Sequence, residues 1–510
     1  MMTPHAITVA ELVERCGWPA LGVVRIIGDT SARVRGVNMD SRRVHADDLF
    51  ACVSGDNFDG SQFAADAVQR GATAVLTNAE LDLDVAQIIV NDVRRALGPV
   101  AATVAGNPSQ SMRVVGVTGT NGKSTVVHLL DAIYQAGRRS RGTIGTIGIT
   151  INGVSSKADF TTPEAPELQS WLATMSEDGV TDVAMEVSSH ALAQGRVAGT
   201  TFAAVGFTNL SHDHLDYHGD LDSYFAAKAM LFTDGYSRRG VVFVDSPWGK
   251  KLAEQVAAQA DNTMAVTKVG TLPDATLKIE DVLLAQTGTT FTLREATEFT
   301  AVEDSEPRYV STSLLGSFNV ANAAMAIGLA RAVGIEWSDI FSGISGAARV
   351  PGRMEPVELD RPYTVVVDFA HTPDGLTHVL SSAQELTPVG QVICVFGCGG
   401  DRDKLKRPLM GTAVATHADV VIVTSDNPRS EDPSAIIDDI LTSTELSAHP
   451  DVTVQPDRRR AIAEALLRAQ AGDMVVVAGK GHETGQIIGK IVVPFDDRDV
   501  VRAVAEEIAT

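Results

Sequence analysis

The chain repeats one local pattern, in which a short uninterrupted apolar run is followed by Gly, Asp or Ser and then by a segment of helical periodicity. Apolar runs without alternation predict strands covered on both faces, and therefore mostly parallel sheets flanked by helices in an α/β fold. The runs predicted as strands are 112–117, 182–187, 203–208, 241–245, 363–368, 391–396, 419–424 and 474–478. Because ligands of such sheets bind beyond the carboxyl ends of the strands, we expect functional groups in the polar segments that follow these runs.

The length and two punctuated segments predict three domains. The chain has 510 residues, which leaves room for about three domains at roughly 100–200 residues each. The Gly- and Pro-containing segments 105–110 and 347–353 read as junctions. We therefore predict domains at 1–106, 107–348 and 349–510.

Composition narrows the classes of partner. The chain has 42 Lys and Arg against 64 Asp and Glu, a net charge of −22, which argues against nucleic acid as the main partner but permits a local basic pocket.

Four cysteines are too few for a disulfide framework, and Cys394 and Cys398 lie in an apolar run where buried thiols are favoured over metal ligands. No apolar stretch approaches the roughly 20 residues of a membrane span. The amino terminus lacks the signature of a secretory peptide, so a cytoplasmic location is expected.

A phosphate-binding loop follows the strand predicted at 114–117. Its residues are Thr118, Gly119, Thr120, Asn121, Gly122, Lys123, Ser124 and Thr125, and a helical stretch at 126–136 comes next. Small residues allow backbone N–H groups to surround phosphate oxygens, Lys123 would reach the terminal phosphates, and the Ser124 hydroxyl would bind Mg²⁺. Val117 stands where the common GxxxxGK[ST] pattern has Gly. We interpret the loop as an ATP site; the alternative is a helix-capping turn with an exposed lysine.

Two further residues are candidates for the chemistry. Glu186 ends the run 182–187, where a carboxylate often completes a nucleotide-bound Mg²⁺ site; the alternative is a capping carboxylate. Lys228 interrupts the apolar face formed by Phe225, Ala229 and Phe232. A lysine that snorkels to solvent is the ordinary explanation. The alternative is a desolvated amine of lowered pKa that reacts with carbon dioxide, giving a carbamate whose oxygens could hold Mg²⁺.

Three histidines and two aspartates lie within residues 211–218. The cluster could indicate zinc, but no fourth ligand follows at a familiar spacing. A phosphate-facing loop with one histidine near the nucleotide metal agrees better with the neighbouring segments.

The order of these segments resembles the Mur ligases, ATP-dependent amide-forming enzymes of peptidoglycan precursor synthesis. The resemblance spans nearly the whole chain and is carried by Gly119–Thr125, Glu186–His190, Asn209–Asp216, Tyr224–Phe232, Gly316–Asn322, Pro351–Glu355 and Asp368–Asp374. It implies a central P-loop-type mononucleotide-binding domain with a parallel sheet, a C-terminal Rossmann-like α/β domain that binds the amino acid, and a smaller N-terminal α/β domain that binds the UDP substrate.

The resemblance narrows to the ligases that add the third amino acid. The matching segments are Gly400–Lys404, Thr424–Arg429 and Gly479–Glu483. In this family the tetrapeptide Asp426–Arg429 looks like the signature for meso-2,6-diaminopimelate, whereas the lysine-adding members carry a different one. Diaminopimelate differs from lysine by a remote carboxylate, which a guanidinium can bind through two parallel hydrogen bonds. Without the family context, the tetrapeptide is merely a turn sequence.

The resemblance also implies a role for single residues. The uridine end of the substrate should meet Ser41, and the muramoyl-dipeptide path should be lined by Thr161, Thr162, Ser188, Gln194 and Arg196. Around ATP we expect Asn319, Arg353, Asp368 and His371 in addition to Gly119–Thr125. The amino acid should meet Arg402, Asp426, Asn427, Pro428, Arg429, Gly479 and Glu483. Lys123, Glu186, His214 and Lys228 are implied as catalytic, with one Mg²⁺ held by Ser124 and Glu186 and a second by Glu186, His214 and carbamylated Lys228.

Three positions depart from the family pattern. The segment Gly55–Gly60 lacks the His that is often found after its first Gly, Phe160 stands where Asn is frequent, and Phe369 replaces a frequent Tyr. These changes concern the uridine contacts, one possible substrate hydrogen bond and a ring in the ATP region.

The expected reaction joins meso-diaminopimelate to the D-Glu γ-carboxylate of UDP-MurNAc-L-Ala-D-Glu, through an acyl phosphate formed with ATP. The expected partners are these small molecules, with no nucleic acid and no membrane span, and the chain is expected to be a monomer. The alternatives are a lysine-adding Mur ligase, a folylpolyglutamate-type ligase, a P-loop kinase or NTPase that forms no amide, and an inactive nucleotide-binding scaffold.

Overall fold

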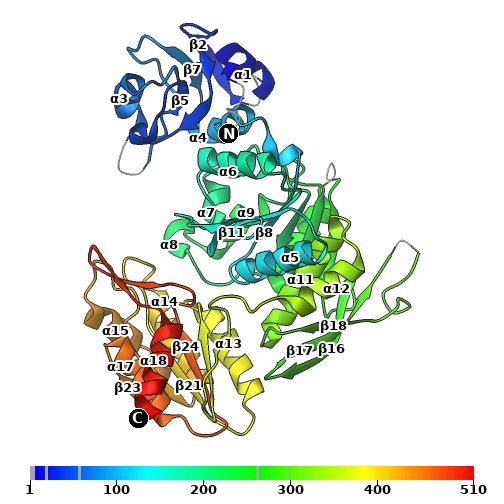
Figure 1. Ribbon diagram of the computed structural model, residues 1–510, viewed down its shortest axis with the longest axis vertical. Helices are drawn as coiled ribbons and strands as arrows, with labels where there is room; N and C mark the ends of the chain where they lie inside the picture. The colour runs from blue at the N-terminus through cyan, green and yellow to red at the C-terminus, as the bar shows by residue number, and fades with distance from the viewer. Residues whose placement is uncertain (1–5, 18–20, 56–58, 260–262, 298, 510) are drawn as a thin grey trace.

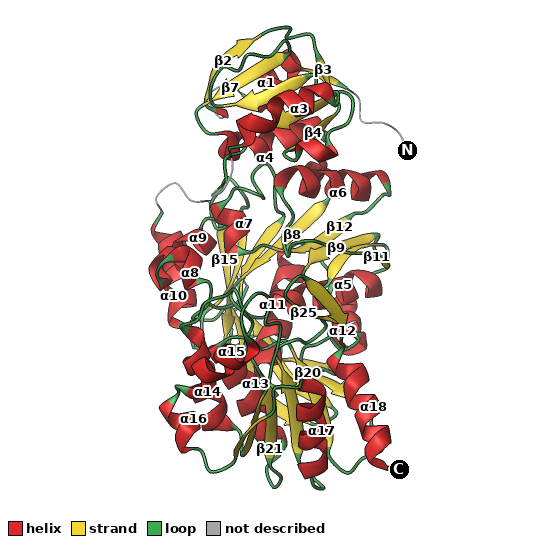
Figure 2. Ribbon diagram, turned by 90° about the vertical axis from the view of Figure 1, so that its left-hand side faces the viewer, coloured by secondary structure: helices red, strands yellow, loops and turns green. Residues whose placement is uncertain are grey.

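The computed structural model describes residues 6–17, 21–55, 59–259, 263–297 and 299–509. Three α/β units follow one another along the long axis of the molecule, with the N-terminal unit at one end and the C-terminal unit at the other (Figures 1 and 2). Each of the three large sheets falls wholly inside one of the ranges 1–106, 107–348 and 349–510, and these boundaries remain a prediction.

The N-terminal unit is built on a five-stranded sheet in the order β2-β7-β6-β5-β4, parallel except for the edge strand β2. Its strands are β2 (Val23–Ile27), β4 (Gly36–Asn38), β5 (Asp48–Ala51), β6 (Ala74–Thr77) and β7 (Ala86–Val90), with a small pair β1 (Ile7–Thr8) and β3 (Arg33–Val34). Its helices are α1 (Val9–Cys16), α3 (Ala64–Gln69) and α4 (Val93–Val104). Helix α4 packs closely against the central unit at Gly98, where an added Cβ would stand 2.3 Å from the Ala198 carbonyl oxygen.

The central unit contains an eleven-stranded sheet in the order β11-β10-β9-β12-β8-β13-β14-β15-β16-β17-β18. Its strands are β8 (Arg113–Thr118), β9 (Arg141–Gly145), β10 (Gly148–Ile151), β11 (Val154–Ser156), β12 (Asp182–Glu186), β13 (Ala204–Phe207), β14 (Arg239–Phe243), β15 (Ala265–Gly270), β16 (Leu277–Ala285), β17 (Gly288–Glu295) and β18 (Arg308–Thr312). One face is covered by α5 (Lys123–Ala136), α11 (Ser317–Ala332) and α12 (Trp337–Gly346). The other is covered by α6 (Ala165–Glu177), α9 (Leu221–Ala229) and α10 (Pro247–Ala258), near the short helices α7 (Ser189–Ala193) and α8 (Leu215–His218).

The C-terminal unit has a six-stranded sheet in the order β19-β20-β24-β21-β22-β23. Its strands are β19 (Glu355–Val357), β20 (Thr364–Asp368), β21 (Val392–Phe396), β22 (Val420–Val423), β23 (Val452–Val454) and β24 (Met474–Ala478), followed by the hairpin β25 (Gly485–Ile488) and β26 (Ile491–Pro494). Helices α13 (Pro373–Leu386), α14 (Lys406–His417), α15 (Pro433–Leu441) and α16 (Thr444–Ala448) cover one face. Helices α17 (Arg458–Arg468) and α18 (Asp497–Ala509) cover the other.

The expected strands are all present, and the strands between β9 and β16 of the central sheet and between β20 and β23 of the C-terminal sheet pair in parallel. The antiparallel ends of the central sheet, β9–β11 and β16–β18, were not expected from the apolar runs. Many residues of these strands are partly or fully exposed, as in β16 and β18, whereas the strands of the parallel core are buried on both faces.

One expected helical face needs correction. Helix α9 ends at Ala229, and Phe232 lies beyond it in a tight turn where its N–H donates to the Ala229 carbonyl. Phe225, Lys228, Ala229 and Phe232 are nevertheless all buried. Cys394 and Cys398 are buried as expected, and burial raises the pKa of the Cys398 thiol to about 12. Within the described ranges, no helix is both long and apolar enough to cross a bilayer.

A fully buried ion pair holds the C-terminal unit together beside the end of β24. Arg458 donates from Nε to Asp497 Oδ1 at 2.8 Å and from Nη2 to Asp497 Oδ2 at 2.7 Å, and both side chains are fully buried. We expect Asp497→Ala to lower the free energy of unfolding by about 3–5 kcal/mol, because it leaves the Arg458 charge buried without its partner. Urea denaturation followed by circular dichroism measures the free energy of unfolding. The control is Glu507→Ala, which removes an exposed ion pair with Arg459. Equal stability of the two variants would contradict the prediction.

Candidate functional site

The loop between β8 and α5 closes tightly on its neighbours. Gly119 and Gly122 have φ angles of +149° and +86°. A Cβ at Gly119 would lie 1.9 Å from Thr208 Oγ1, and one at Gly122 would lie 2.2 Å from Asn322 Oδ1. Both positions therefore require glycine, and the loop leads directly into the N-terminus of α5, where backbone N–H groups favour an anion.

Two lysines converge on one carbonyl of this loop. Lys123 Nζ donates to the Gly119 and Thr120 carbonyls, each at 2.9 Å. Lys228 Nζ donates to the same Gly119 carbonyl at 2.8 Å and lies 4.4 Å from the centroid of the Tyr224 ring. Only 1% of Lys228 is exposed, so its head group does not snorkel to solvent. Burial, and the nearby Lys123 charge, lower the pKa of Lys228 well below its usual value, while Asp213 opposes the shift. A neutral amine is thereby favoured.

Glu186 ends β12 beside the loop rather than capping a helix. Its Oε1 accepts from the Ser124 hydroxyl at 2.9 Å and from the Thr146 backbone N–H at 2.8 Å. The cap of the next helix, α7, is instead Ser188. The touching hydroxyl and carboxylate are oxygen ligands of the kind that Mg²⁺ takes together with substrate phosphates and water. Among the described residues there is no group of three or more His, Cys, Asp or Glu that could hold a metal by itself, so zinc at the histidine cluster finds no support.

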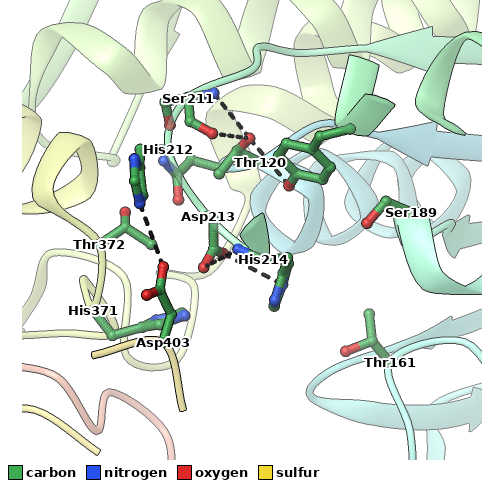
Figure 3. Close-up of polar contacts among 12 residues, drawn as sticks. Thr120, Thr161, Ser189, Ser211, His212, Asp213, His214, His371, Thr372 and Asp403 are labelled. Atoms are coloured by element: carbon green, nitrogen blue, oxygen red, sulfur yellow. Dashed lines mark hydrogen bonds and ion pairs between the residues drawn. The ribbon is translucent and has the colours of Figure 1, made fainter. Parts of the chain in front are cut away.

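The loop 211–214 joins the central and C-terminal units (Figure 3). His212 Nε2 lies 3.3 Å from Asp403 Oδ2, and Lys406 Nζ lies 3.9 Å from Asp213 Oδ1. Burial would raise the pKa of Asp213, but His214, His371, Lys406 and Lys123 outweigh it and lower that pKa to about 2. His214 lies with its Nε2 3.3 Å from Asp213 Oδ2, and burial lowers the pKa of its imidazole. A neutral imidazole is the form that binds metals.

The residues expected around ATP lie on both sides of this junction. Arg353 Nη2 donates to the Ser124 hydroxyl at 3.3 Å, and its guanidinium carbon stands 4.6 Å from the Phe369 ring centroid, so the departure at Phe369 preserves a stacking surface. Asp368 accepts from the Met354 and Ala370 N–H groups, and burial raises its pKa against the opposing charge of Arg353.

Asn319 is buried behind the loop. It donates to the Leu315 carbonyl and accepts from Asn322, and Asn322 is the residue that packs against Gly122. Asn319 therefore supports Asn322, and Asn322 is the residue that lies against the loop.

The residues expected along the muramoyl-dipeptide path form one network. The Thr162 hydroxyl donates to the Glu186 carbonyl at 2.9 Å, and Arg196 donates to the Thr162 carbonyl and to Gln194 Oε1. Thr161 and Ser188 belong to the same network through Thr146 and Thr162. Phe160, at the second departure, lies with its ring 4.9 Å from the Arg196 guanidinium.

Ser41 is separate from this network. It lines a cavity of about 1520 Å³ between the N-terminal and central units, together with Arg42, Arg43 and Phe160. The departure within Gly55–Gly60 involves Asp56, Asn57 and Phe58, which lie outside the described residues.

The residues expected to bind the amino acid meet at the end of β24. Asn427 Nδ2 donates to Glu483 Oε2 at 2.7 Å, and Arg429 Nη1 donates to the Gly400 carbonyl at 2.7 Å. Arg429 has a φ of +53°, a conformation that residues other than glycine adopt only when their surroundings hold them there. Asp426 Oδ2 is buried and accepts no hydrogen bond from the described residues. A Cβ at Gly479 would stand 2.5 Å from it, so only glycine fits beside this oxygen.

One cavity of about 350 Å³ connects the nucleotide loop with the amino-acid residues. Of the expected site residues, it is lined by Thr120, Asn121, Gly122, Lys123, Ser124, Thr161, Glu186, Ser188, His214, Arg353, His371, Arg402, Asp426, Asn427, Arg429, Gly479 and Glu483. The expected residues that do not line it are Ser41, Gly119, Thr125, Thr162, Gln194, Arg196, Lys228, Asn319, Asp368 and Pro428. Most of the predicted residues are therefore brought together, and the others stand behind them or, like Ser41, in the separate cavity.

Several residues of the cavity were not predicted. Thr146, Asp213, Asp403 and Lys406 line it, and Lys480 is buried directly beneath the amino-acid residues. Lys406 and Asp403 lie in the same segment as Arg402, directly after a buried strand and its Gly-rich loop. This position could have identified them as site residues from the sequence. Thr146 offered no such signal, because it is brought to Glu186 only by the fold.

Comparison with known proteins gives consistent matches over the chain. Family profiles described as the Mur ligase catalytic domain, the Mur ligase middle domain and the Mur ligase glutamate ligase domain match residues 33–114, 117–330 and 352–481. The UDP-N-acetylmuramoyl-L-alanyl-D-glutamate–2,6-diaminopimelate ligase of Gloeobacter violaceus is 44% identical over 92% of this chain and 93% of its own.

Solved structures agree with these matches. A structure of a UDP-N-acetylmuramoyl-L-alanyl-D-glutamate–2,6-diaminopimelate ligase superposes with a TM-score of 0.70 and 32% identity, covering 99% of this chain and 100% of the other. The fold is also that of the MurF ligase from Thermotoga maritima in complex with ADP, with a TM-score of 0.61, 18% identity and coverage of 93% and 97%. The chain therefore belongs to the Mur ligase family and has its three-domain α/β fold.

Proposed function

We propose that the chain is an ATP-dependent ligase that adds meso-2,6-diaminopimelate to the D-Glu γ-carboxylate of UDP-MurNAc-L-Ala-D-Glu in peptidoglycan precursor synthesis. The observation that carries the proposal is the shared cavity, in which Lys123 and Glu186 of the central unit face Arg429 and Glu483 of the C-terminal unit. A kinase needs the first pair only. The second pair supplies a charged seat for an amino acid at the same place.

The chemistry requires an activated acid. A γ-carboxylate oxygen of D-Glu attacks the γ-phosphorus of ATP, and ADP leaves, which gives an acyl phosphate. The amine of diaminopimelate then attacks the acyl carbon; phosphate leaves and the amine loses a proton. Lys123 and Arg353 bring positive charge to the transferring phosphoryl group, which is the main contribution that such sites make.

Magnesium would be held by Ser124 and Glu186, which already touch one another, and by residues near them. Ser124 and Glu186 would hold one ion, and Glu186, His214 and a carbamate on Lys228 would hold the second. Bound Mg²⁺ supplies countercharge for the phosphate oxygens. The carbamate would form when the neutral Lys228 amine adds to carbon dioxide, making an N–C bond and releasing a proton; its support is the burial and lowered pKa of this amine.

The contacts between the two units have a consequence for water. His212–Asp403, Lys406–Asp213 and the hydrogen bond from Asn121 Nδ2 to Asp374 hold the C-terminal unit over the nucleotide loop. This closed arrangement would protect the acyl phosphate from hydrolysis. Hydrolysis as fast as attack by the amine would count against it. A monomeric state and a cytoplasmic location remain predictions.

The decisive experiment is ligation by the purified chain. With ATP, Mg²⁺, UDP-MurNAc-L-Ala-D-Glu and meso-diaminopimelate, we expect equal amounts of tripeptide product, ADP and phosphate, measured by chromatography. Formation of ADP without a new amide would favour a kinase or NTPase. Ligation of glutamate to a folate would favour the folylpolyglutamate-type alternative, and absence of turnover an inactive scaffold.

A further inference from the structure

Lys480 carries a fully buried ammonium group in the loop after β24. None of its surface is exposed. Its Nζ donates to the Gly485 carbonyl at 2.6 Å, to Glu483 Oε2 at 3.0 Å and to Asn427 Oδ1 at 3.2 Å. A lysine head group has three donors, so all of them are used within the protein. Lys480 therefore has no donor left for a substrate and must act through its neighbours.

The contacts of Lys480 determine how Asn427 is oriented. Asn427 Oδ1 accepts from Lys480 and from the Ile487 backbone N–H at 2.9 Å, while its Nδ2 donates to Glu483 Oε2 at 2.7 Å. With donors on one side and an acceptor on the other, the amide has one favourable orientation. Removal of the ammonium would take away the charged donor that distinguishes this orientation from its flip.

Lys480 also fixes the carboxylate of Glu483. Both hydrogen bonds from the described residues, from Lys480 and from Asn427, go to Oε2, and Oε1 receives none from them. Glu483 lines the cavity. The pairing thus holds one oxygen inside the protein and leaves the other for a ligand.

The hairpin β25–β26 connects this arrangement to Arg429. Gln486 Nε2 donates to the Asp426 carbonyl at 2.6 Å, the Arg429 N–H donates to the Ile487 carbonyl at 3.0 Å, and the Gly489 N–H donates to the Arg429 carbonyl at 2.7 Å. Lys480 in turn anchors the start of the hairpin through the Gly485 carbonyl. One buried charge therefore links the segment 426–429, Glu483 and the hairpin.

We propose that Lys480 is the positioning residue that orients Asn427 and Glu483 for the amino-acid substrate. The inference rests on the proposed function, because it takes the cavity formed by these residues as the amino-acid site. Lys480 does not contact the substrate; it sets in advance the direction of an amide and of a carboxylate that do. This pre-organisation lowers the cost of binding the amino acid and has no part in the attack on ATP.

The test variant is Lys480→Met, which keeps the length of the side chain and removes the charge. We expect KM for diaminopimelate to rise about 10–100-fold, as for the loss of a hydrogen bond to a charged group. The kcat at saturation and the KM values for ATP and the UDP substrate should stay within about threefold, since only amino-acid binding is affected. Lys490→Met, at the exposed turn of the same hairpin, is the matched control and should behave as the unmodified protein.

A second measurement separates positioning from misfolding. Hydroxylamine traps the acyl phosphate formed from ATP and UDP-MurNAc-L-Ala-D-Glu without any amino acid. Lys480→Met should give hydroxamate at the unmodified rate. The two residues act as a unit, so the effects of Lys480→Met and Glu483→Gln should not add. The double variant should bind diaminopimelate about as well as whichever single variant binds it less tightly.

The outcomes are distinct. Loss of hydroxamate together with ligation in Lys480→Met would make the residue merely structural, and an unchanged KM for diaminopimelate would give it no role; either result overturns the inference. Fully additive effects in the double variant would also overturn it. If the unmodified protein forms neither hydroxamate nor tripeptide, the proposed function itself is wrong, and the inference is wrong with it.

Discussion

Replacement of Lys228 by alanine is expected to lower ligation by about 10²–10³-fold, the loss typical of removing one pre-organised charged group at a transition state. The amine is fully buried, donates to the Gly119 carbonyl of the nucleotide loop and has a strongly lowered pKa. The lowered pKa increases the fraction of the lysine that is neutral, which is the form that can add to carbon dioxide and become an anion. The substitution removes that anion and leaves a small space beside the loop.

The same space permits chemical rescue. Added formate, acetate or bicarbonate should restore part of the activity of Lys228→Ala, because a small carboxylate can take the place of the carbamate. Steady-state ligation rates measured with and without these anions check this. Lys250→Ala, an exposed lysine on α10, is the control and should neither lose activity nor respond to the anions. Unchanged turnover in Lys228→Ala would show that the residue takes no part in the reaction.

The parallel cores of the two larger sheets could be predicted from the sequence because their strands are buried on both faces. Val114–Val117 and Met474–Ala478 are continuous apolar runs, and the polar residues after them line the cavity. The strands β16–β18 are partly exposed and carry polar residues among their apolar ones, so the apolar runs did not indicate their antiparallel pairing, in which β16 and β17 form a hairpin closed at Ala285 and Gly288. The end of α9 was missed for a related reason: Phe232 continues the apolar pattern although the chain has already left the helix.

The candidate site shows the same limit. Gly119–Thr125 could be recognised because the chemistry lies in one contiguous segment. Thr146 is a single polar residue whose partner, Glu186, is far away in sequence. Asp213 and Lys406 lie in or beside segments that the sequence indicates, but their contact joins parts of the chain that are distant in sequence. Lys480 was passed over within a motif from which Gly479 and Glu483 were selected, since nothing local indicates that its ammonium is buried. Resemblance to a family supplies residues that touch substrates, whereas the residues that hold them in place emerge from the structure.

The choice of amino acid is expected to depend on Arg429. Its guanidinium lines the cavity, and the hairpin holds its backbone in a left-handed conformation. Two parallel charge-assisted hydrogen bonds to the distal carboxylate of diaminopimelate contribute about 3–4 kcal/mol, which corresponds to a preference over L-lysine of about 10²–10³-fold in kcat/KM. Arg429→Ala should lose most of this preference by raising KM for diaminopimelate, with little change in the use of lysine.

Arg429→Lys separates charge from geometry. Lysine keeps the positive charge but cannot make the paired hydrogen bonds of a guanidinium, so we expect a preference between those of the unmodified protein and Arg429→Ala. Competition assays with both amino acids in one reaction measure the ratio directly, and hydroxylamine trapping shows that each variant still activates the acid. If the unmodified protein used the two amino acids equally well, the lysine-adding alternative would be favoured. If Arg429→Lys kept the full preference, charge alone would account for selection. Retention of that ratio by Arg429→Ala would place the distal carboxylate elsewhere in the cavity, with Arg402 as the remaining arginine of the expected amino-acid site.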